Sequence, residues 1–393
     1  MSVYAIICEY DPFHAGHAWQ IAEIRRRDPA AVVLCVMSGS FTQRGTPALF
    51  SPFVRAERAV RGGADAVLLL PMPFSASSAE RFAKAGAYVA AQCGAEVLAF
   101  GAECGNEEDL RRVAERLRSE TFRRAMREAV RSSHDSVGYP RARAAVYASC
   151  FGEEDLSLLT GPNNMLALEY LHAADTLGLR TVVLPRIGAG HDEPGCTGAY
   201  ASASAIRAAL RRGEEPGGCF GEDAALYTAL FTSGHASDAE RAGAYLLGRL
   251  SFLPAQRIEQ CADVPVGMGT RLSALADRCD TVEAFFRGAA TKKYTDARIR
   301  RMVLAALLEI EKADAAALPR YTLLLAASRA GCRHLRGLSP SPAFTVLTKP
   351  AAARNMDAAA QAQFDIERRA ERLYRLTVRD PLPTPGKPFI KTD

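Results

Sequence analysis

The ten cysteines of this 393-residue chain include no C-x-x-C pair and no regular spacing. This excludes a zinc ribbon and a disulfide framework, and it favours reduced thiols in a cytoplasmic protein. No apolar run reaches the ~18 residues that a membrane-spanning helix needs. A basic leader is missing too, because acidic Glu9 and Asp11 directly follow the first apolar run. We therefore expect neither secretion nor insertion into a membrane.

A strong excess of charge of either sign is also absent. Forty-nine Lys and Arg against 44 Asp and Glu leave a net charge of +5, which permits an anionic partner without requiring one. With 48% hydrophobic and 24% charged residues, the composition excludes collagen-like and disordered classes. At roughly 100–200 residues per domain, the length predicts two or three domains, each with its own core.

The first hundred residues alternate short apolar runs with helical patterns. The apolar runs are residues 4–8, 31–37, 66–70 and 96–100, and the helical stretches between them are residues 16–27, 52–61 and 78–93. This β-α-β-α order, with nearly continuous aliphatic strands, predicts a Rossmann-like α/β fold with a parallel sheet covered by helices on both faces. A further strand is expected at residues 181–184, so that the α/β domain spans residues 1–210.

The second half of the chain has a helical pattern. After a polar, glycine-rich boundary at residues 211–218, helices are expected at residues 223–230, 239–250, 272–278, 281–286 and 296–311, with another at 356–374 in a proline-rich tail. The prediction is an α-helical domain with a C-terminal tail over residues 219–393. One more helix is expected at residues 106–131, where interleaved Arg and Glu favour a solvated face over an RNA-binding stripe.

The most informative motif is His14-Ala15-Gly16-His17, which lies directly after the first strand and opens a helix. Histidines three residues apart on a helix share one face. The small Ala15-Gly16 pair lets a phosphate approach the backbone amides at the positive end of the helix. A strand–turn–H-x-G-H–helix unit is how nucleotidyl transferases hold ATP, because imidazole donors stabilise the α-phosphate under attack. Two surface histidines in a turn by chance are the alternative.

Several ordered motifs together resemble one family. They are Glu9-Tyr-Asp-Pro-Phe-His-Ala-Gly-His17, Val36-Met-Ser-Gly-Ser-Phe-Thr-Gln-Arg-Gly45, Gly63-Ala-Asp65, Phe100-Gly-Ala-Glu103, Gly161-Pro-Asn-Asn164, Arg186-Ile-Gly-Ala-Gly-His191 and Thr291-Lys-Lys-Tyr-Thr295. Their order and spacing resemble the bacterial tRNA(Met) cytidine acetate ligase family, a branch of the H-x-G-H nucleotidyltransferase-like (HUP-type) proteins. The resemblance extends to about residue 375.

The resemblance implies a two-step reaction. ATP adenylates acetate to give acetyl-AMP and pyrophosphate, and the acetyl group then moves to the wobble cytidine of elongator tRNA(Met), giving N4-acetylcytidine. ATP is the co-substrate and Mg²⁺ is expected to arrive with it, while no metal site made of protein ligands is expected. The implied partners are tRNA, acetate and ATP, with no membrane and no stable protein partner.

The resemblance also implies roles for individual residues. His14, His17 and Arg186 are expected to be catalytic. The expected nucleotide-binding residues are Ile7, Cys8, Glu9, Tyr10, Asp11, Pro12, Phe13, His14, Ala15, Gly16, His17, Ala18, Trp19, Gln20, Gly101, Asn163, Arg186, Ser202 and Arg207. For three residues a structural role is the alternative. Asn163 would cap a helix at residues 165–172, Arg186 would be a surface residue at a strand end, and Ser204, the alternative to Ser202 as a phosphate ligand, would be a plain helix N-cap.

The expected tRNA contacts combine cations with an aromatic ring. They are Arg44, Lys292, Lys293, Tyr294, Arg298 and Arg301. Residues 287–312 carry seven Lys or Arg against three Asp or Glu, a local net charge of +4 that suits a phosphate backbone. A solvated helix start would give a similar pattern.

Departures from the family pattern and two rival functions remain. Ala15 is apolar where the family usually has a polar residue, Thr46 replaces an acidic residue, and residues 51–54 replace a Lys-Trp-like segment. One rival is an adenylyltransferase for a phosphorylated small molecule, which would not need a long basic helical domain. The other is an RNA-binding relative that has lost catalysis, against which the intact His14 and His17 argue.

Overall fold

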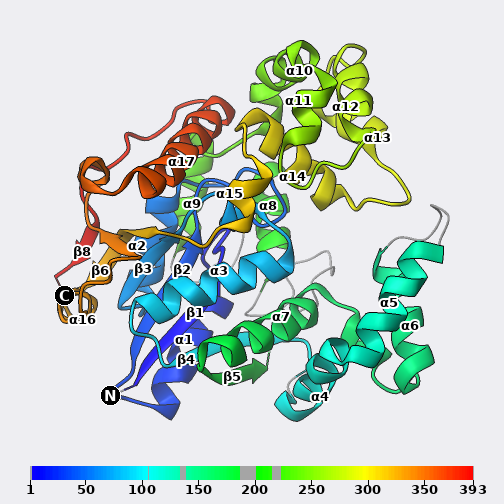
Figure 1. Ribbon diagram of the computed structural model, residues 1–393. Helices are drawn as coiled ribbons and strands as arrows, with labels where there is room; N and C mark the ends of the chain where they lie inside the picture. The colour runs from blue at the N-terminus through cyan, green and yellow to red at the C-terminus, as the bar shows by residue number, and fades with distance from the viewer. Residues whose placement is uncertain (1, 105, 133–138, 186–200, 215–222, 393) are drawn as a thin grey trace.

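The computed structural model describes residues 2–104, 106–132, 139–185, 201–214 and 223–392. Its centre is a sheet in the order β5-β4-β1-β2-β3-β6-β7, with β8 also paired to β6 (Figure 1). The strands are β1 (Val3–Cys8), β2 (Val32–Ser38), β3 (Ala66–Leu70), β4 (Val97–Ala102), β5 (Arg180–Pro185), β6 (Tyr321–Ser328), β7 (Thr345–Leu347) and β8 (Phe389–Lys391). Strands β1 to β5 are mutually parallel, and each lies within two residues of its predicted run. The predicted parallel α/β sheet is confirmed.

Helices cover both faces of the parallel strands. Ile21 and Ile24 of α1 and Val60 of α2 pack on one face, against side chains of β1 and β2 that alternate with those packed against the opposite helices. The opposite face is covered by α3 and α7. The bounds are α1 (Ala15–Arg27), α2 (Pro52–Arg61), α3 (Ala79–Gln92) and α7 (Pro162–Leu177). Every residue of β2 and β3 is buried, as expected for strands covered on both sides.

A second hydrophobic core lies in the helical lobe, by which we mean residues 239–316. Its elements are η4 (Ala239–Ala242), α10 (Gly243–Phe252), α11 (Ala255–Gln260), α12 (Met268–Ala276), α13 (Val282–Ala289), α14 (Asp296–Leu307) and α15 (Lys312–Ala316). Two helices precede the lobe, α8 (Ala203–Arg211) and α9 (Ala224–Thr232). The lobe core includes Leu250, Phe285 and Met302, and it extends to Phe41 and Met72 of the α/β part. The lobe is therefore packed against loops that leave the sheet.

The predicted C-terminal tail is wrong in one respect, because residues 321–391 return to the sheet. Strand β6 pairs with β3 in antiparallel fashion, and β7 and β8 pair with β6. The segment also contains α16 (Arg329–Arg336), η5 (Pro350–Asn355) and α17 (Ala358–Thr377). Residues 219–393 are thus not helical throughout, and their last part completes the α/β sheet. A short apolar run such as that of β6 cannot be distinguished from a buried helix by periodicity alone.

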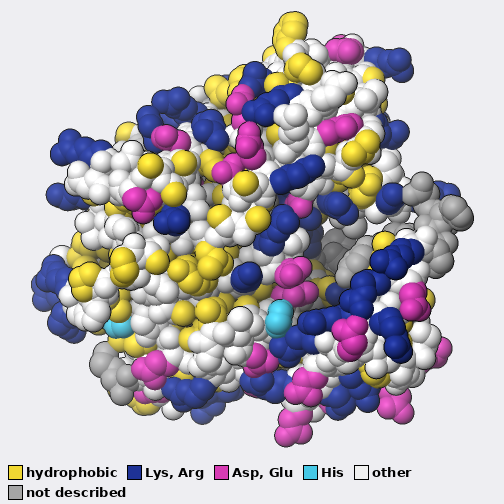
Figure 2. All heavy atoms as spheres, in the orientation of Figure 1, with side chains coloured by type: hydrophobic (Ala, Val, Ile, Leu, Met, Phe, Trp, Pro, Cys, Tyr) yellow, Lys and Arg dark blue, Asp and Glu magenta, His cyan; other side chains and the backbone are white. Residues whose placement is uncertain are grey.

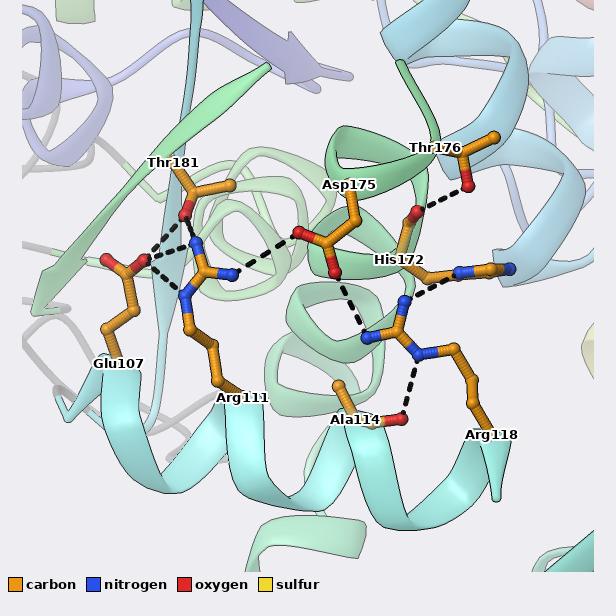
Figure 3. Close-up of polar contacts among 8 residues, drawn as sticks. All are labelled: Glu107, Arg111, Ala114, Arg118, His172, Asp175, Thr176 and Thr181. Carbon is orange, nitrogen blue, oxygen red and sulfur yellow. Dashed lines mark hydrogen bonds and ion pairs between the residues drawn. The ribbon is translucent and has the colours of Figure 1, made fainter. Parts of the chain in front are cut away.

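The predicted helix at residues 106–131 is two helices, α4 (Glu107–Arg118) and α5 (Glu120–Ser132). Ser119 is extended and its hydroxyl accepts the Phe122 amide at 3.2 Å, which starts a new helix. Helix α4 is joined to α7 by ion pairs of Arg111 and Arg118 with Asp175, at 3.3 and 3.1 Å (Figure 3). These arginines stabilise the packing of α4 against α7. A further helix, α6 (Tyr139–Phe151), follows, and η2 (Leu156–Leu159) leads into α7.

The cysteines in the described ranges are free thiols, including the buried Cys8, Cys35 and Cys93. Within the same ranges, no helix has both the length and the apolar character needed to cross a membrane.

Candidate active site

His14 and His17 form a reciprocal cap at the start of α1. His14 is the N-cap residue, and its Nδ1 accepts the Gly16 amide at 3.1 Å. In return, His17 Nδ1 accepts the His14 amide at 3.3 Å. Because each Nδ1 is an acceptor, each neutral ring carries its proton on Nε2. The motif therefore produces two Nε2–H donors at the positive end of a helix.

The two imidazoles are stacked and held by aromatic neighbours. Their ring centroids are 3.7 Å apart with an interplanar angle of 27°, which confirms the prediction that they share one face. The His17 ring lies 4.7 Å from that of Tyr10 and 5.8 Å from that of Phe13. Gly16 lets the His14 ring lie close to the backbone, because an added Cβ would lie 3.0 Å from His14 Cε1 and the ring would have to shift.

Both histidines line a cavity of about 470 Å³ at the carboxyl ends of β1, β4 and β5. Strand order reverses between β1 and β4, and open α/β sheets bind ligands at such a switch point. The other predicted residues that line the cavity are Ile7, Cys8, Glu9, Tyr10, Asp11, Gly16, Trp19, Gln20, Arg44, Gly101, Asn163, Ser202 and Arg207. Pro12, Phe13, Ala15 and Ala18 are not in its lining. Arg186 lies outside the described residues.

An apolar wall of the cavity was not predicted. It comprises Phe82, Phe100, Leu166 and Tyr170. Two of these could have been found, since Leu166 and Tyr170 follow Pro162 at intervals of four residues and so share one face of α7. A flat apolar wall opposite polar donors is the usual composition of a small-ligand site.

A second helix start, that of α8, lies at the same cavity. Ser202 is its N-cap and accepts the Ala205 amide at 3.1 Å. Arg207 donates to Ser204 Oγ at 3.1 Å and to the Asp11 carbonyl oxygen at 2.6 Å. Arg207 therefore fixes the start of α8 against the loop that precedes α1. The cavity receives the positive ends of two helices, which is an arrangement suited to an anion.

Asn163 does not cap a helix at residues 165–172, because α7 begins at Pro162 with Gly161 as its N-cap. The Asn163 backbone amide and side-chain amide both donate to Glu103 Oε1, at 3.1 and 2.6 Å. The Asn164 amide donates to the other oxygen of the same carboxylate at 2.5 Å. Glu103 thus occupies the amides at the start of α7, and Asn163 is held at the rim of the cavity.

The loop after β2 connects the cavity with the helical lobe. The Gln43 amide donates to Glu9 Oε1, and burial raises the pKa of the Glu9 carboxyl. The Gln43 carbonyl oxygen accepts from Arg301 of α14 at 3.4 Å. Gly45 has a φ of +76°, and an added Cβ would lie 3.0 Å from the backbone of Arg300 and Arg301. The loop therefore touches the cavity on one side and α14 on the other.

Arg55 is a supporting residue that the sequence analysis missed. Its guanidinium is fully buried and donates to the carbonyl oxygens of Phe50 and Ser38, at 3.0 and 3.1 Å, and also to those of Glu9 and Gly39. Burial lowers its pKa. Arg55 ties together the chain leaving β1 and the chain leaving β2. The available signal was a charged residue on the face of α2 that also carries buried Ala56, Ala59 and Val60.

The predicted tRNA contacts divide into two groups. Lys292 and Lys293 are exposed, and Tyr294 lies beneath Lys293 Nζ and the Arg298 guanidinium, 5.8 and 4.8 Å from its ring centroid. Arg301 differs, since only 11% of its side chain is exposed and it lies 3.8 Å from Asp263. Burial lowers the Arg301 pKa. Through its bond to the Gln43 carbonyl oxygen, Arg301 supports the loop after β2.

No group of three or more His, Cys, Asp and Glu side chains in the described part of the chain is arranged to hold a metal ion.

Comparisons with known proteins agree on one family. Residues 1–385 match the model of the HIGH Nucleotidyl Transferase family. The tRNA(Met) cytidine acetate ligase of Exiguobacterium sibiricum is 34% identical over 80% of this chain and 79% of its own. That of Alkaliphilus metalliredigens is 29% identical over 97% and 95%. Crystal structures of Thermotoga maritima TmcAL, apo and bound with alpha-thio ATP, are each 26% identical, with TM-scores of 0.88 and 0.86. They cover 97% of this chain and 96% and 95% of their own.

Proposed function

The chain belongs to the HIGH nucleotidyl transferase family, within the group of tRNA(Met) cytidine acetate ligases, and from this premise we propose that it activates acetate with ATP and acetylates the wobble cytidine of elongator tRNA(Met). The observation that carries the proposal is that His14 and His17 both line a 470 Å³ cavity at the start of α1, while the Nδ1 atom of each ring accepts a backbone amide, which leaves Nε2 as the donor. The alpha-thio ATP complex of the Thermotoga relative supports an adenine nucleotide as the ligand.

In the first step, an acetate oxygen attacks the α-phosphorus of ATP and pyrophosphate leaves with the electron pair of the broken P–O bond. Negative charge grows on the non-bridging oxygens of that phosphate. His14 and His17 would donate their Nε2–H groups to these oxygens, and preorganised donors of this kind stabilise a transition state more than a ground state. Arg207 and the α8 amides would hold the departing phosphates. Arg186 is a further proposed phosphate contact.

In the second step, the N4 amine of cytidine attacks the carbonyl carbon of acetyl-AMP. The C–O bond to the phosphate breaks, AMP leaves, and the amine loses one proton to solvent. Neither step requires a protein nucleophile. Mg²⁺ bound to the phosphates of ATP would neutralise part of their charge.

The RNA is proposed to reach the site from the helical side. Lys293 and Arg298 lie over the Tyr294 ring. With the exposed Lys292 they could hold phosphates while the ring offers a stacking surface. Lys and Arg side chains are visible at the right of Figure 2, on helices α10–α14 of the helical lobe above and on helices α4–α6 below. Arg44 lines the nucleotide cavity and is proposed to contact the RNA near the acceptor cytidine.

The test is an incubation of the purified protein with ATP, labelled acetate and total tRNA. We expect label in one tRNA species, N4-acetylcytidine at its wobble position by nucleoside mass spectrometry, and acetate-dependent exchange of pyrophosphate into ATP. Exchange that needs a phosphorylated metabolite in place of acetate would identify an adenylyltransferase. Tight tRNA binding without any ATP turnover would identify a non-catalytic relative.

A further inference from the structure

A second cavity, of about 670 Å³, lies where the loop after β2, α8 and the helical lobe meet. Three residues line both this cavity and the nucleotide cavity, namely Asp11, Thr46 and Arg207. The two spaces therefore adjoin at these three residues. A compound in the second cavity would lie next to the helix start that carries His14 and His17.

The lobe side of this second cavity offers a stacking surface. Phe286 of α13 is half-buried, and the Arg300 guanidinium of α14 lies 5.3 Å from its ring centroid. Ile299, Val303 and Leu307 continue this apolar surface along α14 at helical spacing. An aromatic ring beside a guanidinium plane is the pairing on which proteins stack unpaired RNA bases.

The carboxylates around the cavity differ in how many of their oxygen atoms already have a hydrogen-bond or ion-pair partner. Glu240 accepts the Val282 and Glu283 amides at 2.9 and 2.7 Å, so its carboxylate caps α13. Glu283 pairs with Arg287. Asp11 is different because Oδ1 accepts the Leu49 amide at 2.6 Å while Oδ2 is 3.5 Å from Arg207, which leaves lone pairs for another donor.

We propose that the second cavity receives the unpaired cytosine base of the acceptor RNA, stacked on Phe286 and Arg300, with its exocyclic amine directed to Asp11. A carboxylate is the acceptor that suits the N4 amine of cytosine. The exposed Lys292 and Lys293 precede α14 directly, so an RNA backbone held there would deliver a base to the same helix. This assignment rests on the proposed function, because it identifies the site of the second substrate.

The experiment compares Phe286→Ala, Arg300→Gln and Phe286→Tyr with the wild-type protein. Alanine loses the stacking surface, so we expect kcat/KM for tRNA acetylation to fall about 10- to 100-fold, with a smaller fall for Arg300→Gln and recovery to within about threefold for Phe286→Tyr. Acetate-dependent pyrophosphate exchange should stay within about twofold of wild type in all three. Phe252→Ala is the matched control, because Phe252 is on the same lobe and 88% exposed.

A binding measurement tests the second cavity without any catalytic turnover. An anticodon hairpin with pyrrolocytosine at the wobble position should change its fluorescence on binding to the wild-type protein, and this change should be lost with Phe286→Ala. Acetylation and fluorescence unchanged in Phe286→Ala would overturn the assignment, as would an equal loss of exchange and acetylation in a folded variant. If Phe286→Ala does not fold, Arg300→Gln decides by the same criteria. If the wild-type protein binds the labelled base but shows no acetate-dependent pyrophosphate exchange, the proposed function is contradicted and the base site remains supported.

Discussion

The two histidines of the H-x-G-H motif each have two roles that a substitution can separate. Nδ1 of each ring holds the start of α1, and Nε2–H is the donor proposed for the α-phosphate. Asn at position 14 keeps an acceptor at the N-cap, where it ranks among the best residues, so the free energy of unfolding should change by less than about 0.5 kcal/mol. His14→Ala removes the cap as well and should cost about 1 kcal/mol.

The same substitution should reduce catalysis far more than stability. Removing one preorganised donor to a developing oxyanion typically lowers kcat about 10²- to 10³-fold, or roughly 3–4 kcal/mol of transition-state stabilisation. We expect this loss in acetate-dependent pyrophosphate exchange for His14→Asn, and also for His17→Gln, because Gln at that position can still accept the His14 amide. His14→Ala should lose no more activity than His14→Asn.

The assay pairs the exchange rate at saturating ATP and acetate with unfolding in denaturant. His235→Asn is the control histidine, since His235 bonds the Asp380 carbonyl oxygen and does not line the nucleotide cavity. If His14→Asn kept more than a tenth of the wild-type exchange rate, the imidazole would not be the donor. A loss of activity that tracked the loss of stability across the variants would likewise refute the reasoning.

Gly45→Ala should lower the free energy of unfolding by about 2–4 kcal/mol, because its Cβ meets backbone at 3.0 Å and its φ is +76°. Gly213→Ala, with a φ of +70° and open space, should cost only about 1–2 kcal/mol in the same denaturant titration. Burial raises the pKa of Glu367 from its ordinary 4.5 to about 7, so the folded state holds a proton that the unfolded state loses first. Stability should therefore fall as pH rises from 4.5 to about 7, and Glu367→Gln should flatten this dependence in thermal melts. The double change Lys292→Ala and Lys293→Ala should weaken tRNA binding and reduce the slope of log K against log salt by about 1–2 in filter binding.

Much of the sheet could be predicted because its strands are buried on both faces. β2 and β3 are continuous aliphatic runs bounded by polar turns, so a local pattern is enough to identify them. β6 is just as apolar, but its partner β3 is some 250 residues earlier in the chain, and no local signal reports such a pairing. The sequence pattern therefore identified the nucleotide half of the sheet and missed the strand that extends it.

The candidate site also has features that depend on neighbouring residues in the sequence and features that depend on contacts between distant segments. That His14 and His17 share one face follows from a four-residue motif and was predicted, whereas their reciprocal capping was not. The buried position of Arg301 was not, because a basic cluster in sequence does not show which of its members turns inward. Arg55 was missed for a related reason, since its partners are backbone carbonyl groups from segments that meet only in the folded chain.

The loop after β2 links the helical lobe to the nucleotide cavity of the α/β part. Glu367 of α17 accepts the Met72 amide at 2.7 Å, and its carboxylate lies beside Gly39, where an added Cβ would approach to 2.7 Å. The C-terminal helix therefore sets the start of the loop, Arg301 of α14 holds its middle, and Gln43 bonds the Glu9 carboxylate in the nucleotide cavity. The loop therefore links α14 to the nucleotide cavity by direct contact. Because that contact is direct, binding of the second substrate can influence the geometry around the first without any motion of the sheet.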